Sequence, residues 1–143
     1  MTEPKQDPDE LLSAADSDFL AEKYPTAAVY KVGDEVHVLF PAFPFPDSYA
    51  PHAADLLVRL PPGYADANPD MFWTRQDVKL VSRAWPQNSE HHEVPGAGKG
   101  VEVYAGIPWQ RWSRHFDHAA WRAGIDGLRS YMRAIQREQE RRV

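Results

Sequence analysis

The sequence predicts an α+β domain with a helix at each end and an antiparallel sheet between them. Three observations predict this order. Apolar residues recur at helical spacing near both ends of the chain, and they alternate with period two in the middle. Most of the thirteen prolines also fall between Pro41 and Pro69, where turns are therefore expected. A chain of 143 residues is the length of one domain, so we expect a single domain over residues 1–143, with residues 1–6 as a disordered tail.

The N-terminal helix is predicted to begin at Asp7-Pro8-Asp9-Glu10, with Asp7 as N-cap and proline at the first helical position. An apolar stripe then runs to about Lys23, with Asp16–Asp18 as a candidate break. Tyr24-Pro25 ends the helix, because the residue before proline is pushed out of the α region. The stripe consists of Leu11, Leu12, Ala15, Phe19 and Leu20.

Two strands, Ala27–Val32 and Glu35–Phe40, are predicted to form a hairpin that turns at Gly33-Asp34. The alternation in the second strand indicates one buried face. The segment Pro41–Pro46 lacks too many backbone donors to continue a central strand. We expect it to be an extended, proline-rich corner whose two phenylalanines are anchored in the core.

Ala54–Leu60 is the third predicted strand, and Met71–Thr74 the fourth, with Val78–Val81 as a further candidate. Short links between consecutive strands favour a four-stranded antiparallel β-meander. Residues 82–100 show no periodicity and are predicted to be a long loop. Loops of that length are commonly functional or mobile.

The C-terminal helix is predicted from Ala123 or Gly124 to Arg141. Its expected buried face consists of Ile125, Leu128, Met132 and Ile135. The row formed by Arg133, Arg137 and Arg141 is interpreted as a solvated helix face.

Composition excludes several classes of function. The net charge of −5 is unsuited to nucleic acid, which needs a basic face. The sequence has no run of about 18 apolar residues and begins with an acidic, polar stretch, so neither a membrane span nor a secretory signal is expected. The absence of cysteine removes disulfides and zinc–thiolate sites and fits a reducing compartment. The expected location is cytoplasmic, and no cofactor is expected.

One stretch concentrates groups that can carry chemistry, and it runs from Trp109 to Phe116. It places a hydroxyl, Ser113, two residues before an imidazole, His115. In an extended segment such side chains share a face. Eight residues after Ser113 comes Trp121, at the start of the last helical pattern.

A second informative stretch is Leu60-Pro61-Pro62-Gly63-Tyr64, followed by Pro69-Asp70-Met71-Phe72-Trp73. Such a segment turns a strand sharply and pins the turn with a tyrosine against the next strand.

Together these motifs resemble the ubiquitin-conjugating enzymes, which share the UBC fold. That family places its nucleophile after the meander and a tryptophan eight residues later, as Ser113 and Trp121 stand here. The recurring phrases Trp-Ser-Arg-His and Pro-Asp-Met-Phe-Trp are similar to those of its bacterial branch. The resemblance covers roughly Phe19 to Ile135. It implies two partners, a ubiquitin-like protein and its activating enzyme, and often a JAB-type isopeptidase in the same pathway.

The sequence also departs from the family pattern. The usual nucleophile is a cysteine, and this chain has none. The His-Pro-Asn element is missing, since Ala105 stands where its Asn would fall. Val81–Glu102 is an insertion or a rebuilt loop. The chain stops after the helix that follows the nucleophile, without the family's last two helices.

The resemblance implies that Ser113 accepts the carboxyl terminus of the ubiquitin-like protein as an oxyester and passes it to an amine. A serine hydroxyl needs a base to become a nucleophile, and His115 is the candidate. Arg114 or a backbone N–H is the candidate stabiliser of the oxyanion. Asp117 is the candidate that orients His115.

Four other interpretations stay open, and a fifth, a phosphate-binding loop, does not fit the sequence. Ser-x-His is a common pair and no triad signature, so Ser113 and His115 can be structural. The chain can be an inert UBC-like module that only binds a ubiquitin-like protein or activating enzyme. It can also be a small hydrolase of diffusible esters.

His91-His92-Glu93 with His115, Asp117 and His118 suggests a metal but lacks the helical His-Glu-x-x-His spacing. Gly96–Gly100 resembles a phosphate loop without its first glycine and its Ser or Thr, and is predicted to be a loop tip.

Overall fold

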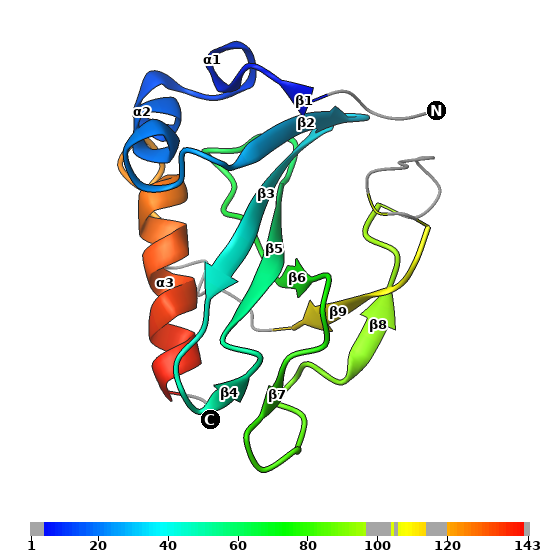
Figure 1. The fold of residues 1–143 in the computed structure, drawn as a ribbon. Helices are drawn as coiled ribbons and strands as arrows, with labels where there is room; N and C mark the ends of the chain where they lie inside the picture. Colours follow the sequence, from blue (N-terminus) through cyan, green and yellow to red (C-terminus); the bar gives the residue numbers. More distant parts are fainter. Residues whose placement is uncertain (1–4, 97–103, 105, 114–119, 142–143) are drawn as a thin grey trace.

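A computed structural model describes residues 5–96, 104, 106–113 and 120–141 of the chain. Figure 1 shows helices gathered on one side of a sheet. The α+β class predicted from the sequence is confirmed. In chain order the elements are β1 (Lys5–Gln6), α1 (Pro8–Leu11), α2 (Ala14–Lys23), β2 (Ala28–Val32), β3 (Glu35–Pro44), β4 (Tyr49–Ala50), β5 (Ala53–Leu60), β6 (Phe72–Thr74), β7 (Lys79–Leu80), β8 (His91–Glu93), β9 (Trp109–Trp112) and α3 (Leu128–Arg141).

The main sheet has seven antiparallel strands in the order β1-β2-β3-β5-β6-β9-β8. The predicted four-stranded meander is its centre, formed by β2, β3, β5 and β6. Strand β1 extends one edge of the sheet. Its residues, Lys5 and Gln6, belong to the stretch expected to be a disordered tail. Strands β9 and β8 extend the other edge, and β9 carries the tryptophan-rich stretch that precedes Ser113.

The N-terminal helical segment is two helices, each with its own cap. Asp7 caps α1 by accepting a hydrogen bond from the N–H of Asp9, and Ser13 caps α2 by accepting one from the N–H of Asp16. The break therefore lies at Leu12–Ser13, and the predicted break at Asp16–Asp18 is wrong. The apolar stripe continues across Ser13, but the capping bond of Ser13 starts a new helix there. The stripe alone therefore does not locate the break.

The proline-rich corner starts later than predicted, because β3 continues through Pro41 to Pro44. The register against β5 shifts between Phe40 and Phe43, and Ala42 sits in the bulge with a φ of 51°. A bulge removes residues from regular pairing, so the missing proline donors are tolerated there. Phe43 and Phe45 are buried, as predicted.

Two predicted boundaries in the second half also change. Lys79–Leu80 pairs with Tyr49–Ala50 in a separate two-stranded sheet, so it does not extend the meander. The predicted loop 82–100 contains the short strand β8, which pairs with β9.

Helix α3 begins at Leu128, later than the predicted start at Ala123 or Gly124. Gly124 has a φ of 82°, and the N–H groups of Ile125 and Asp126 both donate to the carbonyl of Arg122, which closes a turn before the helix. Ile125, predicted on the buried face, is 70% exposed. The other three members of that face, Leu128, Met132 and Ile135, are buried.

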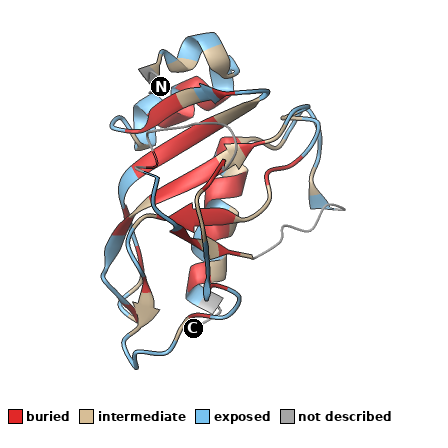
Figure 2. Ribbon diagram, turned by 90° about the vertical axis from the view of Figure 1, so that its right-hand side faces the viewer, coloured by how far each residue is buried: buried red, intermediate tan, exposed pale blue. Residues whose placement is uncertain are grey.

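The sheet is covered on both faces, with a hydrophobic cluster on each. The larger cluster lies between the sheet and helices α2 and α3, and it includes Phe19, Phe40, Trp112 and Met132. The smaller one lies on the opposite face and includes Trp73, Tyr104 and Trp109. Figure 2 shows the buried residues running along the strands and along the helix behind them. No helix in the described part of the chain is long and apolar enough to cross a membrane.

Candidate functional site

Ser113 is the first residue after strand β9 and is half-buried. Its backbone N–H donates to the carbonyl of Asn88 at 2.8 Å, on the segment that leads into β8. This bond extends the contact between the two segments past the last paired residues. The backbone of Ser113 is therefore held at the edge of the sheet, although the regular strand has ended.

Trp112 fixes the strand immediately before Ser113. Its indole is fully buried, stacks on Phe72 with ring centroids 5.3 Å apart, and donates from Nε1 to the Thr74 hydroxyl at 3.0 Å. Trp112 fills the helix-covered core, so the strand that leads to Ser113 is fixed by packing up to its last residue.

Gln110 connects β9 to the segment between β6 and β7. Its side chain is buried and bonds to both backbone groups of Val78: Oε1 accepts from the N–H at 2.7 Å, and Nε2 donates to the carbonyl at 3.0 Å. The amide thus takes the place of a strand partner for Val78. Removing the Gln110 side chain would leave the backbone N–H and carbonyl of Val78 buried without partners. Gln110 therefore ties β9 to the segment after β6, in addition to the pairing of β9 with β6 and β8.

The other face of β9 carries alternating aromatic and charged groups. Arg111 NH1 lies 3.3 Å from the carboxylate of Glu93 in β8, and that carboxylate also accepts from Trp73 Nε1 at 3.1 Å. The Arg75 guanidinium lies 4.9 Å from the centre of the Trp109 ring. These contacts run across β6, β9 and β8 and stabilise the strand that ends at Ser113.

The segment after the site is anchored at Trp121. The indole Nε1 donates to the carbonyl of Ala65 at 2.8 Å, and the Tyr64 ring packs against the indole with centroids 6.4 Å apart. Trp121 precedes α3 and does not lie in it, which corrects the expectation that it begins the last helix. The eight-residue interval of the sequence therefore has a fixed point at each end, Ser113 and Trp121.

Tyr64 has a different partner from the one predicted. Its hydroxyl donates to the Asp16 carboxylate of α2 at 2.6 Å, whereas the motif predicted a contact with the next strand. The other oxygen of the carboxylate accepts from the N–H of Leu128 at 3.0 Å. Burial raises the pKa of Tyr64 well above its ordinary value of 10.0, and the hydrogen bond to Asp16 raises it further. Asp16 thus joins α2, the turn after β5 and the start of α3.

Of the four predicted site residues, the structure describes Ser113 alone. Arg114, His115 and Asp117 lie outside the described residues, as do Ala105, His118 and most of the glycine-rich stretch.

Two of the suggested metal ligands in β8 have other partners. His92 lies 2.8 Å from a carboxylate oxygen of Asp77, and Glu93 binds Arg111 and Trp73. No group of three or more His, Asp or Glu side chains among the described residues is arranged to hold a metal ion.

A buried histidine that sequence reasoning did not single out lies on the second face of the sheet. His37 is fully buried, with Nδ1 against the Tyr104 hydroxyl and Nε2 at 2.9 Å from Glu35. Arg59 donates twice to the same carboxylate, at 3.1 and 3.2 Å. In the sequence, His37 alternates with the apolar Val36 and Val38, so its side chain is expected on the solvent-exposed face of the strand. No local signal predicts that Tyr104 covers it. In the sheet, the two strands β5 and β6 lie between β3, which carries His37, and β9, which ends just before Ser113.

The family defined by this fold and motif set is that of the E2, or ubiquitin-conjugating, proteins. The profile of the family described as Prokaryotic E2 family E matches residues 12–142, and the chain belongs to this family. Membership confirms the resemblance found in the sequence and assigns the chain a role of the ubiquitin-conjugating kind, in concert with ubiquitin-like proteins and their activating enzymes. No curated protein and no solved structure gives a significant match.

Proposed function

We propose that this protein conjugates a ubiquitin-like protein to target amines through an oxyester on Ser113, in the cytoplasm. The main support is the position of Ser113: it directly follows a strand that is paired with β6 and β8, its backbone N–H is bonded to Asn88, and it is half-buried. Family membership supplies the class of reaction. The chain has no cysteine, so a serine oxyester replaces the thioester.

The first step transfers an acyl group. The Ser113 Oγ attacks the carbonyl carbon of the ubiquitin-like C-terminus, which is carried as a thioester on the activating enzyme. His115 takes the hydroxyl proton and returns it to the departing thiolate, so that one C–O bond forms and one C–S bond breaks. In the second step an amine attacks the ester, an amide forms, and Ser113 regains its proton.

The tetrahedral intermediates of both steps carry a negative oxygen that needs a donor. The N–H of Ser113 is already bonded to Asn88, so this particular backbone group is a poor candidate. We assign the role to Arg114 or to another backbone N–H, and Asp117 orients His115. A JAB-type isopeptidase would reverse the conjugation.

The experiment is an adduct assay with ATP, the cognate activating enzyme and the ubiquitin-like protein. We expect a covalent adduct that resists thiol reductant, is cleaved by alkali, and is lost in Ser113→Ala. Ser82→Ala, at an exposed serine in a turn elsewhere in the chain, is the matched control and should form the adduct normally. His115→Ala should lose adduct formation with the fold intact, and His52→Ala, at an exposed histidine, should keep it.

The competing function is a binding module without chemistry, and the absence of cysteine favours it. This reading predicts a complex with the ubiquitin-like protein or its activating enzyme but no covalent adduct. Turnover of a small ester without either partner would instead identify a hydrolase.

A further inference from the structure

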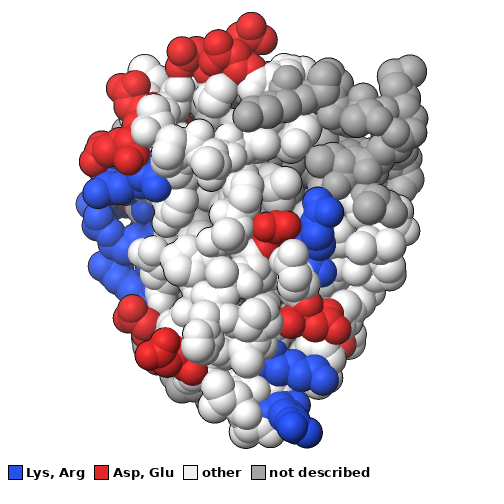
Figure 3. All heavy atoms as spheres, viewed as in Figure 1, with Lys and Arg blue, Asp and Glu red and all other residues white. Residues whose placement is uncertain are grey.

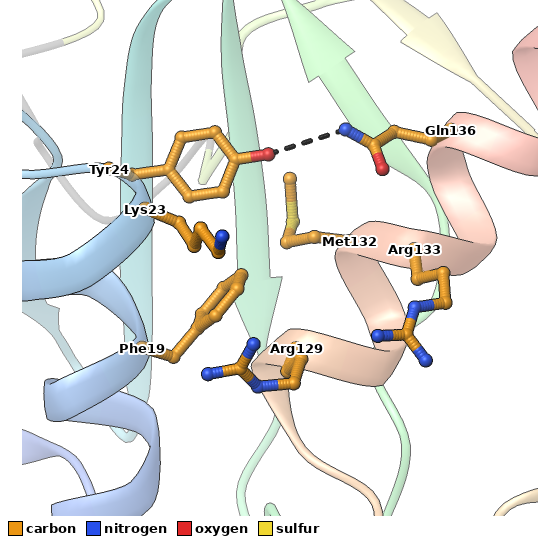
Figure 4. A pocket seen from close by; sticks show the side chains of 7 residues that line it. All are labelled: Phe19, Lys23, Tyr24, Arg129, Met132, Arg133 and Gln136. Carbon is orange, nitrogen blue, oxygen red and sulfur yellow. Dashed lines mark hydrogen bonds between the residues drawn. The ribbon is translucent and has the colours of Figure 1, made fainter.

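A groove runs between helices α2 and α3, and Ser113 lines neither of its two hollows. One hollow in it has a volume of about 320 Å³ and is lined by Phe19 and Met132 with three basic side chains, as Figure 4 shows. At one end the Tyr24 hydroxyl lies 3.5 Å from Gln136 Nε2. The three basic residues are Lys23, Arg129 and Arg133.

A second hollow, of about 410 Å³, lies along the start of α3. Arg129 and Arg133 line both hollows, so these two side chains form the ridge between them. Ile125 lines the second hollow and is 70% exposed, the largest exposed fraction of the described large apolar side chains. The carboxylates of Asp16 and Asp126 also line the second hollow, and both are bonded within the chain: Asp16 accepts from Tyr64 and Leu128, and Asp126 accepts from the N–H of Arg122. The groove therefore combines apolar surface with cations along one side of α3, and its acidic groups already have partners.

The cations exceed the acidic groups that pair with them. Lys23 and Arg129 both pair with one carboxylate, that of Glu22, at 3.6 and 3.5 Å. Arg133 is exposed and forms no ion pair with any described residue. The chain as a whole carries a net charge of −5, so this cluster opposes the overall charge. Figure 3 shows basic side chains gathered on the side of the molecule where α2 and α3 lie in Figure 1.

Arg129 is held in place by its own contacts. Its guanidinium lies 4.9 Å from the centre of the Phe19 ring, which keeps the charge over the apolar floor of the groove. Arg129 and Arg133 are one helical turn apart, about 6 Å along the axis. Cations spaced in this way fit a row of carboxylates along a chain better than one compact anion.

We propose that this groove binds an acidic, amphipathic segment of a partner protein. Its carboxylates pair with Lys23, Arg129 and Arg133, and its apolar side chains contact Ile125 and the floor of the groove. Charge complementarity of this kind gives the complex its specificity and makes its affinity depend on salt. The proposal does not depend on Ser113 or on the acyl transfer proposed above.

The test uses three fluorescein-labelled peptides of equal length: glutamate with leucine at every third or fourth position, the same peptide with lysine for glutamate, and glutamate with serine for leucine. Anisotropy titrations measure affinity, and ¹⁵N–¹H spectra of the full chain locate the contact. We expect the first peptide to bind at the α2 and α3 resonances. Affinity should fall at least tenfold in Arg129→Gln/Arg133→Gln and stay unchanged in Lys31→Gln/Arg83→Gln, a control with the same loss of charge at exposed sites.

The charge-reversed variant Arg129→Glu/Arg133→Glu separates a loss of contact from a loss of fold. It should reject the acidic peptide and gain affinity for the lysine peptide, with shifts at the α2 and α3 resonances of a spectrum that keeps the dispersion of the folded chain. Equal binding by the double glutamine variant, or shifts confined to other elements, overturns the proposal. Equal affinity for the serine peptide shows that the groove binds a polyanion and overturns the amphipathic segment.

Discussion

The carboxylate of Asp16 in α2 accepts a hydrogen bond from the backbone N–H of Leu128, the first residue of α3, at 3.0 Å. A helix start leaves its first N–H groups without partners inside the helix, and a nearby side chain usually supplies the acceptor. Here the acceptor comes from a helix more than a hundred residues earlier in the chain. The start of α3 therefore depends on tertiary structure, which is why the helical period alone placed it too early.

Asp16→Ala should destabilise the fold by about 2–4 kcal/mol, because the Leu128 N–H and the Tyr64 hydroxyl both lose their acceptor. Urea denaturation measures the change. Asp18→Ala, at an exposed position on the same helix, should change stability by less than about 0.5 kcal/mol. Equal effects from the two variants would show that the Asp16 carboxylate is not the cap of α3.

Gly127→Ala should cost about 1–3 kcal/mol, because a Cβ at this position would lie 2.7 Å from the nearer Asp16 carboxylate oxygen. The same substitution should cost much less in the Asp16→Ala background, where the obstructing oxygen is gone. A double-mutant cycle by urea denaturation isolates this coupling. Additive effects would place the strain elsewhere.

Stability should fall above about pH 10. The folded-state pKa of Tyr64 is raised above its unfolded value of 10.0 by burial and by Asp16, so the folded protein keeps a proton that the unfolded chain releases. Burial raises the pKa of Tyr131 in the same way. Each tyrosine contributes stability that is fully present below pH 10 and is lost at about 1.4 kcal/mol per pH unit above it. Tyr64→Phe should reduce this slope, measured by denaturation between pH 8 and about 11, whereas Tyr30→Phe is the control on the other face.

The sequence predicts the order of elements well and β9 poorly, for a physical reason. Trp109, Gln110 and Trp112 are all buried because the sheet is covered on both faces there, and the alternation that identifies a half-exposed strand is absent. The same cause hides His37. Strand β3 was cut short at Pro41 because a bulge is not visible in composition.

The structure anchors both ends of the sequence motif, and the catalytic role of Ser113 stays a prediction. The interval between Ser113 and Trp121 corresponds to two fixed points in the structure. The partner of Tyr64 was missed, because Asp16 is polar and lies in the first turn of an otherwise ordinary surface helix. The roles of Arg114, His115 and Asp117 stay predictions.

Ala42→Gly should stabilise the fold by about 0.5–1 kcal/mol, because Ala42 has a φ of 51°, where an L side chain is strained and glycine is not. The bulge geometry and the bond from the Ala42 N–H to Asp55, at 3.0 Å, should survive the change. Thermal and urea denaturation measure the gain. Ala53→Gly, at an exposed position in β5 with no positive φ, should lose stability instead. A loss at both positions would indicate that the bulge is not strained.

Ser113→Cys should convert the proposed oxyester into a thioester without altering the fold. The half-buried position accepts a slightly larger sulfur, and the flanking contacts of Trp112 and the bond to Asn88 do not involve the replaced atom. A thiolate forms more readily than an alkoxide, so the adduct should become less dependent on His115. The measurement is adduct formation with and without thiol reductant, in Ser113→Cys and in Ser113→Cys/His115→Ala. An adduct of the variant that still resists reductant would place the acyl group on another residue, and the oxyester at Ser113 would be excluded.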